Sequence, residues 1–162
     1  MIRPATEADI PVIANLIRAL AEYERLAVEV VLDEARLREH LFGERRYAEV
    51  LLAEDAGDVA GFALFFHNYS TFLTKPGIWL EDLFVRPAHR GRGHGRALLA
   101  ALARIAVERG CGRLEWAVLD WNEPSIAFYR ALGATPMADW TTYRVTGEAL
   151  HTLGRETETA DR

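Results

Sequence analysis

The most constraining feature of the sequence is a glycine- and arginine-rich loop between an apolar strand and an apolar helix. Residues 78–85 have the composition of a strand, and residues 97–107 form an apolar run typical of a helix. Three alternating glycines, Gly91, Gly93 and Gly95, lie between them. Glycine lets backbone N–H groups approach a ligand closely, and the first turn of a helix presents unpaired donors with a partial positive charge. This arrangement predicts a phosphate or pyrophosphate site.

The same loop concentrates positive charge in a chain that is acidic as a whole. The formal net charge is -5, yet no acidic residue occurs between Asp82 and Glu108. The basic residues in and beside the loop are Arg86, His89, Arg90, Arg92, His94 and Arg96. We therefore expect an anionic ligand at the loop. The acidity elsewhere argues against nucleic-acid binding and is compatible with a cationic substrate.

The rest of the chain predicts one mixed α/β domain over residues 1–154, followed by a charged tail over residues 155–162. A length of 162 residues is enough for a substantial core. Hydrophobic periodicity predicts a helix that starts near Thr6–Asp9 and further helices over 33–42, 97–107 and 124–132. Strands are predicted over 50–53, 59–66, 78–85, 113–119 and 141–145. The helix over 97–107 is so apolar that we expect it to be buried.

Several classes of protein and site are excluded by composition. Cys111 is the only cysteine, so neither an internal disulfide nor a cysteine-based zinc site is expected. The five histidines lack the usual ligand spacings, and we expect no metal site. No apolar run is long enough to span a bilayer, and residues 1–4 lack a signal core. These observations predict a cytoplasmic protein without a membrane partner.

The loop also fails the tests for two familiar nucleotide motifs. A P-loop requires Lys followed by Ser or Thr after its last glycine, whereas Arg96 follows Gly95 here. A dinucleotide fingerprint that starts at Gly91 would need Gly or Ala at position 96. The pattern Arg/Gln-x-x-Gly-x-Gly/Ala does fit, with Arg90, Gly93 and Gly95.

That pattern resembles the GNAT superfamily of N-acetyltransferases, and two further blocks agree with it. Residues 80–87 (Leu-Glu-Asp-Leu-Phe-Val-Arg-Pro) and 121–129 (Trp-Asn-Glu-Pro-Ser-Ile-Ala-Phe-Tyr) are closest to the diamine (spermidine/spermine) N-acetyltransferases. The resemblance covers roughly residues 1–150. It implies a GNAT-like fold of the α+β type, with a central, mostly antiparallel mixed sheet flanked by helices. It also implies acetyl-CoA as co-substrate and a homodimer. The implied acceptor is a primary amine of a small cationic substrate, either a polyamine or diamine or a lysine-like amino acid such as thialysine.

The resemblance assigns the cofactor to three segments. The expected acetyl-CoA contacts are Leu83, Phe84, Val85, Arg90, Gly91, Arg92, Gly93, His94, Gly95, Arg96, Asn122, Ser125 and Tyr129. The last three are spaced i, i+3, i+7 on one helical face. Simpler roles remain open for them: a helix N-cap for Asn122, a solvated first-turn residue for Ser125, and a half-buried ring with a satisfied hydroxyl for Tyr129. The resemblance implies that Tyr129 donates a proton to the departing CoA thiolate.

Two adjacent acids interrupt the apolar strand over 78–85. Because neighbouring strand residues point to opposite faces, only one of Glu81 and Asp82 is expected to face a given pocket. The resemblance favours Glu81 as the catalytic residue that contacts the amine directly or through water, and Asp82 is expected to be an ordinary strand-end residue. A carboxylate helps because an alkyl ammonium, with a pKa of about 10.4, must lose a proton at a cost of roughly 4.6 kcal/mol at pH 7.

The remaining expectations concern the substrate and the reaction course. By resemblance, the amine pocket also contains Tyr23, Glu24, Glu115, Trp116 and Ala117. Simpler roles stay open for two of them: Glu24 as a solvated helix residue and Trp116 as an aromatic side chain of the core. We expect direct attack of the amine on the thioester, without an acyl-enzyme at Cys111. A backbone N–H of Leu83 or Phe84 is expected to stabilise the oxyanion, aided by a strand bulge. The alternative function is a non-catalytic CoA-binding or regulatory domain.

Overall fold

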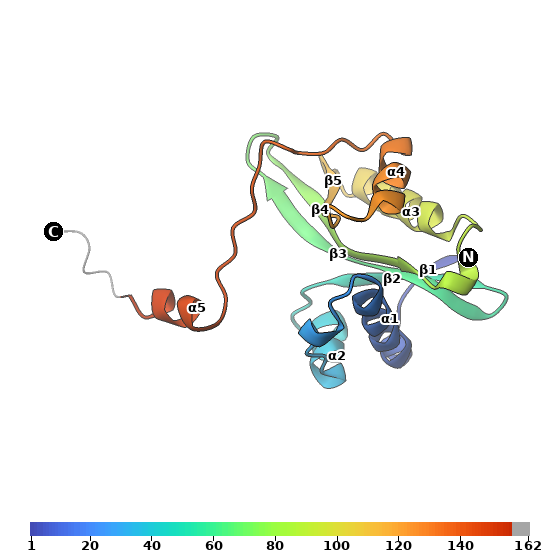
Figure 1. Cartoon of the computed structure of the whole chain (residues 1–162), viewed down its shortest axis with the longest axis horizontal. Helices are drawn as coiled ribbons and strands as arrows, with labels where there is room; N and C mark the ends of the chain where they lie inside the picture. Colours follow the sequence, from blue (N-terminus) through green and yellow to red (C-terminus); the bar gives the residue numbers. More distant parts are fainter. Residues whose placement is uncertain (157–162) are drawn as a thin grey trace. The chain divides into compact units, whose positions relative to one another are not determined.

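The computed structural model describes residues 1–156 (Figure 1). The chain divides into two units. The first unit comprises Met1–Asp120 and the second begins at Trp121. The six C-terminal residues of the predicted charged tail, 157–162, lie outside the described part of the chain. The prediction of one domain over residues 1–154 stays a prediction, and each unit is described by itself.

The first unit is built on a five-stranded sheet with the strand order β1-β2-β3-β4-β5. Its strands are β1 (Ile2–Pro4), β2 (Glu49–Asp55), β3 (Asp58–Ser70), β4 (Lys75–Val85) and β5 (Leu114–Trp116). Neighbouring strands are antiparallel from β1 to β4, whereas β4 and β5 are parallel. This confirms the mixed, mostly antiparallel sheet. The predicted strand over 113–119 exists, but it is only three residues long.

Helices cover both faces of this sheet. Helices α1 (Ile10–Tyr23) and α2 (Glu34–Phe42) lie on one face, and α3 (His94–Glu108) lies on the other (Figure 1). Short 3-10 turns occur at η1 (Glu7–Asp9), η2 (Ala27–Glu29) and η3 (Pro87–His89). The core under α1 and α2 consists of Ile10, Ile13, Leu16, Leu20, Leu41, Val50, Leu52, Phe62 and Phe84.

The start of α1 follows the predicted signal and is also fixed to the sheet. The backbone N–H of Thr6 donates to the Asp9 carboxylate at 2.7 Å. Arg3 pairs with the same carboxylate at 2.8 Å and with Glu54 at 2.6 Å. Arg3 therefore connects β1 with the start of α1 and the end of β2. Its guanidinium also holds the pKa of the Asp9 carboxyl well below its usual range.

Helix α3 differs from the prediction in its start and in its burial. It begins at His94, three residues before the apolar run, because the glycine loop ends directly in the first helical turn. The expectation of a buried helix is wrong for one side. Leu98, Leu99 and Leu102 are buried, whereas the opposite side, which includes Val107, is exposed. Alanine accounts for much of the apolar count, and small alanines are tolerated on an exposed face.

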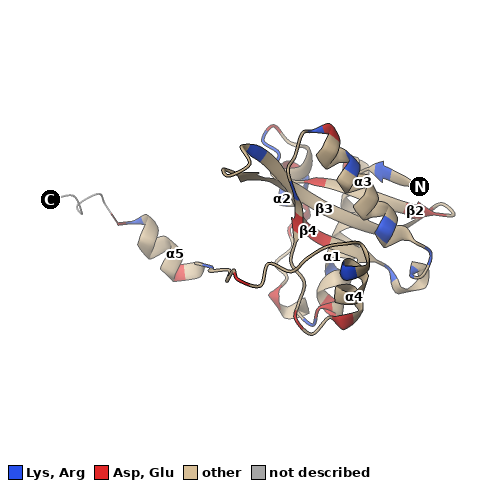
Figure 2. Cartoon of the chain, turned by 90° about the horizontal axis from the view of Figure 1, so that it is seen from above, with Lys and Arg blue, Asp and Glu red and all other residues tan. Residues whose placement is uncertain are grey.

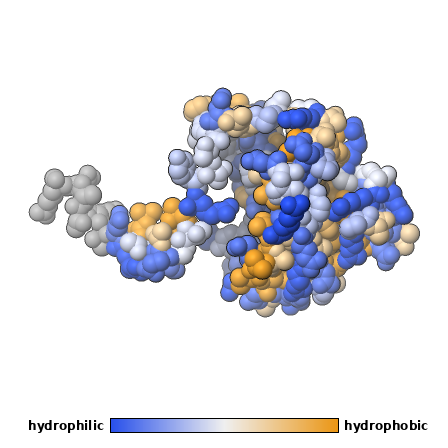
Figure 3. Space-filling model, in the orientation of Figure 1, coloured by the Kyte–Doolittle hydropathy of each residue, from blue (hydrophilic) through white to orange (hydrophobic). Residues whose placement is uncertain are grey.

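The second unit contains the helices α4 (Glu123–Ala131) and α5 (Gly147–Gly154). Gly133, with φ = 88°, ends α4 as predicted. The predicted strand over 141–145 is wrong, because these residues have no strand partner in the described chain. Their large apolar side chains are exposed, and so are Leu150 and Leu153 on α5. Figure 3 shows hydrophobic atoms at the surface of the α5 segment. Throughout residues 1–156, no helix combines the length and the apolar character that a membrane span requires.

Candidate active site

A β-bulge marks the centre of the candidate site in the first unit. In the pairing of β3 with β4, Leu64 lies opposite Asp82, but the next residue, Phe65, lies opposite Leu80. Glu81 is therefore an extra residue on β4 without an opposite residue on β3. A bulge of this kind bends its strand and re-aims the neighbouring side chains. It lies two residues before Leu83, inside the strand where an oxyanion donor was expected.

Three carboxylates gather at this bulge. Glu24 follows α1 directly, and Glu81 and Asp82 are the acidic residues of β4, which interrupt that strand in Figure 2. Loss of hydration is the largest cause that raises the pKa of Asp82 to about 7, and the charges of Glu81 and then Glu24 contribute to the same shift. Burial, and then the charge of Glu81, raises the pKa of Glu24 as well. These three acids are electrostatic neighbours, and Asp82 is poised to exchange a proton near neutral pH.

The bulge corrects the prediction for Asp82. We expected an ordinary strand-end residue, either solvated or paired with an arginine of the following loop. Instead Asp82 is the acid with the strongly raised pKa, while Glu81 is exposed and accepts a hydrogen bond from Nε1 of Trp79 at 2.9 Å. The alternation argument assumed a regular strand. The extra residue at 81 breaks the two-residue period at this point, so the facing of these two side chains stays a prediction.

Arg90 connects the glycine loop to the end of α1. Its Nε donates to the carbonyl oxygen of Val85 at 2.9 Å. Its guanidinium lies 4.9 Å from the ring centre of Tyr23 and 5.5 Å from that of Phe84. Stacking on two rings orients a guanidinium and is worth about 0.5–2 kcal/mol per contact. In this structure Arg90 thus shapes the loop and holds Tyr23, which precedes Glu24.

The backbone of the loop has the conformation of an anion cradle. Gly91 and Gly93 have φ values of 76° and 83°, which only glycine adopts readily. A Cβ atom at either position would meet no atom within 4 Å, so the requirement for glycine comes from conformation and not from crowding. Gly93 precedes α3, and its carbonyl accepts the first helical bond, from Ala97. The N–H groups of residues 94–96 therefore have no acceptor within the helix and suit a phosphate.

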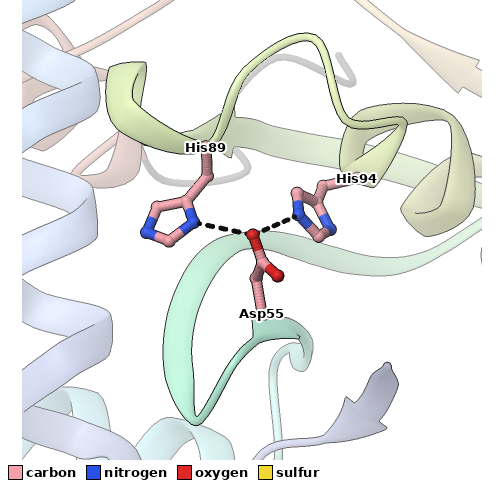
Figure 4. A group of neighbouring side chains, drawn as sticks. All are labelled: Asp55, His89 and His94. Carbon is pink, nitrogen blue, oxygen red and sulfur yellow. Dashed lines mark hydrogen bonds and ion pairs between the residues drawn. The ribbon is translucent and has the colours of Figure 1, made fainter.

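Asp55 binds this loop from the turn between β2 and β3. Its Oδ2 lies 3.1 Å from Nδ1 of His89, 2.7 Å from Nη1 of Arg92 and 3.3 Å from Nε2 of His94 (Figure 4). These partners hold the pKa of the Asp55 carboxyl well below its usual range. This contact could not be predicted from the sequence, because Asp55 is remote along the chain and the loop itself contains no acid.

Strand β5 lies beside the bulge through its parallel pairing with β4. Trp79 pairs with Glu115, and Leu80 pairs with Trp116. Glu115 accepts a hydrogen bond from Nδ2 of Asn68 at 3.4 Å. Two of the three expected substrate residues on this segment therefore pair with the residues of β4 that directly precede Glu81, and Ala117 follows the end of the strand.

The third predicted block lies on α4 of the second unit. Asn122 is the N-cap, because its side-chain oxygen accepts a hydrogen bond from the backbone N–H of Ser125 at 3.4 Å. This confirms the capping role for Asn122 that the sequence left open. Tyr129 lies in the second turn, with its ring centre 5.6 Å from that of Phe128. Cofactor contacts of Asn122, Ser125 and Tyr129 stay predictions.

Comparison with known proteins decides the family. The sequence model of the Acetyltransferase (GNAT) family matches residues 14–134. The chain belongs to this family. Thialysine N-epsilon-acetyltransferase of Bos taurus is 39% identical over 94% of this chain and 96% of its own length. L-ornithine N5-acetyltransferase of Arabidopsis thaliana is 34% identical over 95% of this chain and 87% of its own length.

A solved structure agrees with this assignment. An integron cassette protein from the mobile metagenome of V. cholerae superimposes on this GNAT chain with a TM-score of 0.78. It is 26% identical, and the match covers 96% of this chain and 98% of the other. The protein is therefore an N-acetyltransferase, and the non-catalytic alternative is not supported. GNAT acetyltransferases use acetyl-CoA as their co-substrate.

In this acetyltransferase the surroundings of Cys111 do not suit a nucleophile. Its Sγ lies 3.9 Å from Nδ1 of His67. Nε2 of the same ring lies 2.9 Å from Nη1 of Arg109, which can only donate, so Nε2 is the acceptor and Nδ1 carries the proton. That N–H donates to the carbonyl oxygen of Gly77 at 2.9 Å. Cys111 therefore faces an N–H group and not a base that could remove its proton.

Proposed function

We propose that this acetyltransferase transfers the acetyl group of acetyl-CoA to the terminal side-chain amine of a small basic amino acid. The carboxylates of Glu24, Glu81 and Asp82 carry the proposal, because clustered acids attract and orient a cationic amine. The two relatives described above act on thialysine and on L-ornithine, which are both amino acids with a terminal amine. Polyamines remain the second candidate, since they offer the same amine without a carboxylate.

The glycine loop is proposed to hold the pyrophosphate of acetyl-CoA. The N–H groups at the start of α3 supply the donors, and the positive φ of Gly91 and Gly93 presents them. Leu83, Phe84 and Val85 are proposed to follow the pantetheine arm, with an N–H of Leu83 or Phe84 facing the thioester oxygen. Arg92 and His94 act here by supporting the loop, because Asp55 holds their side chains.

The carboxylate cluster is proposed to prepare the amine for attack. Glu81, exposed at the bulge, orients the ammonium group, and Asp82 receives its proton directly or through water. A base with a pKa of about 7 is matched to this task, because it is partly deprotonated at neutral pH and still holds the proton it receives. The amine nitrogen then forms a bond to the carbonyl carbon, and the C–S bond breaks as the tetrahedral intermediate collapses. The thiolate takes a proton from the hydroxyl of Tyr129, and the second proton that the amine nitrogen loses on becoming an amide returns through water to the Tyr129 oxygen.

A panel of amines tests the substrate. Thiol release from acetyl-CoA is measured with thialysine, L-ornithine, putrescine and spermidine under matched conditions. We expect the highest kcat/KM with an amino acid, and a preference for spermidine would replace the amino acid by a polyamine. Glu81→Gln should lower turnover with every amine, whereas Glu44→Gln, a change at an exposed acid outside the cluster, should not.

Tyr129→Phe tests the proposed proton donor separately. The hydroxyl is needed only when the thiolate leaves, so turnover should fall while the affinity for acetyl-CoA stays nearly constant. Unchanged turnover would remove Tyr129 from the mechanism and leave the carboxylate cluster unaffected.

We also propose that the enzyme is a homodimer. The second unit exposes large apolar side chains, including Met137, Trp140 and Tyr143. Exposed apolar groups of this size are typical of an interface. Light scattering on the purified protein should give twice the mass of the 18.2 kDa chain, and a monomer mass at all concentrations would contradict the proposal.

A further inference from the structure

Two histidines and one aspartate from three different elements meet beneath the glycine loop. Asp55 ends β2, His89 belongs to the turn η3, and His94 is the first residue of α3 (Figure 4). Figure 4 shows both imidazole rings pointing at one carboxylate oxygen. The side chains are partly shielded, with exposures of 24% for Asp55, 17% for His89 and 13% for His94.

The imidazole of His94 has an unusual environment. Its Nε2 is buried and, within residues 1–156, has no hydrogen-bond partner of acceptable geometry, although Asp55 Oδ2 lies 3.3 Å away. A buried polar atom without a hydrogen bond is destabilising by about 1–3 kcal/mol. A ligand placed between this nitrogen and the carboxylate oxygen would remove that cost.

The distances from the carboxylate oxygen to the two imidazole nitrogens are close to those in a metal site. In tetrahedral zinc sites the bonds are about 2.0–2.2 Å long, which places neighbouring donors about 3.3–3.6 Å apart. Oδ2 lies 3.1 Å from His89 Nδ1 and 3.3 Å from His94 Nε2, and all three atoms lie within 4.8 Å of one another. Two imidazoles with one carboxylate favour zinc over magnesium or calcium, which prefer oxygen donors.

We propose that Asp55, His89 and His94 bind a zinc ion that fastens the turn after β2 to the glycine loop. The site has three protein ligands and leaves the fourth position to water. The spacing of histidines along the chain could not reveal it, because the third ligand comes from a hairpin more than thirty residues away. The proposal does not depend on the identity of the acetylated amine.

Arg92 competes with the metal for the same oxygen. Its Nη1 lies 2.7 Å from Asp55 Oδ2, so a divalent cation at the site would be repelled by the guanidinium. The Arg92 side chain is 59% exposed and can turn into solvent. Zinc binding should therefore release Arg92 from Asp55, and removal of the Arg92 side chain should strengthen zinc binding.

The test is a zinc titration of the full chain, without a histidine tag, against a chromogenic chelator. We expect one zinc per chain in the wild type and tighter binding in Arg92→Ala. Affinity should fall by more than about tenfold in Asp55→Asn and in His94→Gln. His151→Gln and Cys111→Ser are controls, because they remove a histidine or a thiol outside the cluster and should leave the affinity unchanged.

Thermal unfolding supplies a second measurement. A ligand that binds only the folded state raises Tm, so zinc should stabilise the wild type and Arg92→Ala but not His94→Gln. Two results would overturn the proposal. One is the absence of stoichiometric zinc uptake by folded wild type and folded Arg92→Ala, and the other is uptake that Asp55→Asn and His94→Gln leave unchanged.

Discussion

The glycine loop and the carboxylate cluster carry opposite charges, and they differ in how those charges are held. In the loop, the basic side chains have neighbours: Arg92 and His94 lie close to Asp55, and Arg90 lies over two aromatic rings. In the cluster, acids lie beside acids, and the pKa values of Asp82 and Glu24 are raised. Paired charges fix a backbone shape, whereas crowded like charges prepare a site to take up a cation or a proton. The loop should therefore depend on its backbone and the cluster on its side chains.

The largest expected effect follows from removing the base of the cluster. Asp82→Asn keeps the size of the side chain but cannot take a proton, so kcat should fall by roughly 10²-fold or more. The affinity for acetyl-CoA, measured by calorimetry, should change little because the loop is untouched. Asp139→Asn, at an exposed aspartate in the second unit, is the matched control. If the affinity for acetyl-CoA fell as much as kcat, the loop and the cluster would not act independently.

The loop should respond to a change in backbone freedom. Gly93→Ala forces a Cβ into a conformation with φ = 83°, at a cost of about 1–2 kcal/mol. We expect a lower Tm and a higher KM for acetyl-CoA, with a smaller effect on kcat. Gly154→Ala is the control. Gly154 is the last residue of α5 and has no positive φ, so alanine at this position should not lower Tm. An unchanged Tm and KM in Gly93→Ala would mean that the loop does not need this conformation.

These two regions also differ in how far the sequence predicted them. The loop could be predicted because its glycines, its preceding strand and its following helix are contiguous, and local sequence determines such a turn. The role of Asp82 could not, because it depends on a bulge and on Glu24, which lies almost sixty residues away along the chain. Asp55 was missed for the same reason. The strand over 141–145 was predicted from composition, but a strand requires a partner, and that depends on tertiary structure.

Stability should reveal the raised pKa of Asp82 without any assumption about the substrate. Its pKa rises from 3.8 to about 7 in the folded protein, so the folded state binds the proton more tightly than the unfolded chain. The carboxyl therefore favours folding at low pH, and stability is lost as the pH rises from about 4 to 7. Asp82→Asn removes this dependence. Its Tm should exceed that of the wild type at pH 8, and the difference should shrink towards pH 4.

A smaller effect is expected from the neighbour of Asp82. The charge of Glu24 raises the pKa of Asp82, and it is the last of the three causes after burial and Glu81. Glu24→Gln should therefore move the rising limb of the kcat/KM–pH profile to lower pH, by less than about one unit. A shift to higher pH would mean that Asp82 is not the group that titrates in this limb.

The smallest effect is expected at Cys111, outside both regions. His67 holds its proton on Nδ1 through Gly77 and Arg109, so it offers the thiol no acceptor, and direct attack by the amine needs no thiolate. Cys111→Ser should leave kcat and KM unchanged, and no acetylated protein should accumulate when acetyl-CoA is mixed with enzyme alone, as measured by intact-mass spectrometry. Complete loss of activity in a folded Cys111→Ser that still binds acetyl-CoA would replace direct attack by a two-step route. In that case the carboxylate cluster would act in the second step, the transfer of the acetyl group from Cys111 to the amine. The loop and the cluster would then no longer account for the whole site.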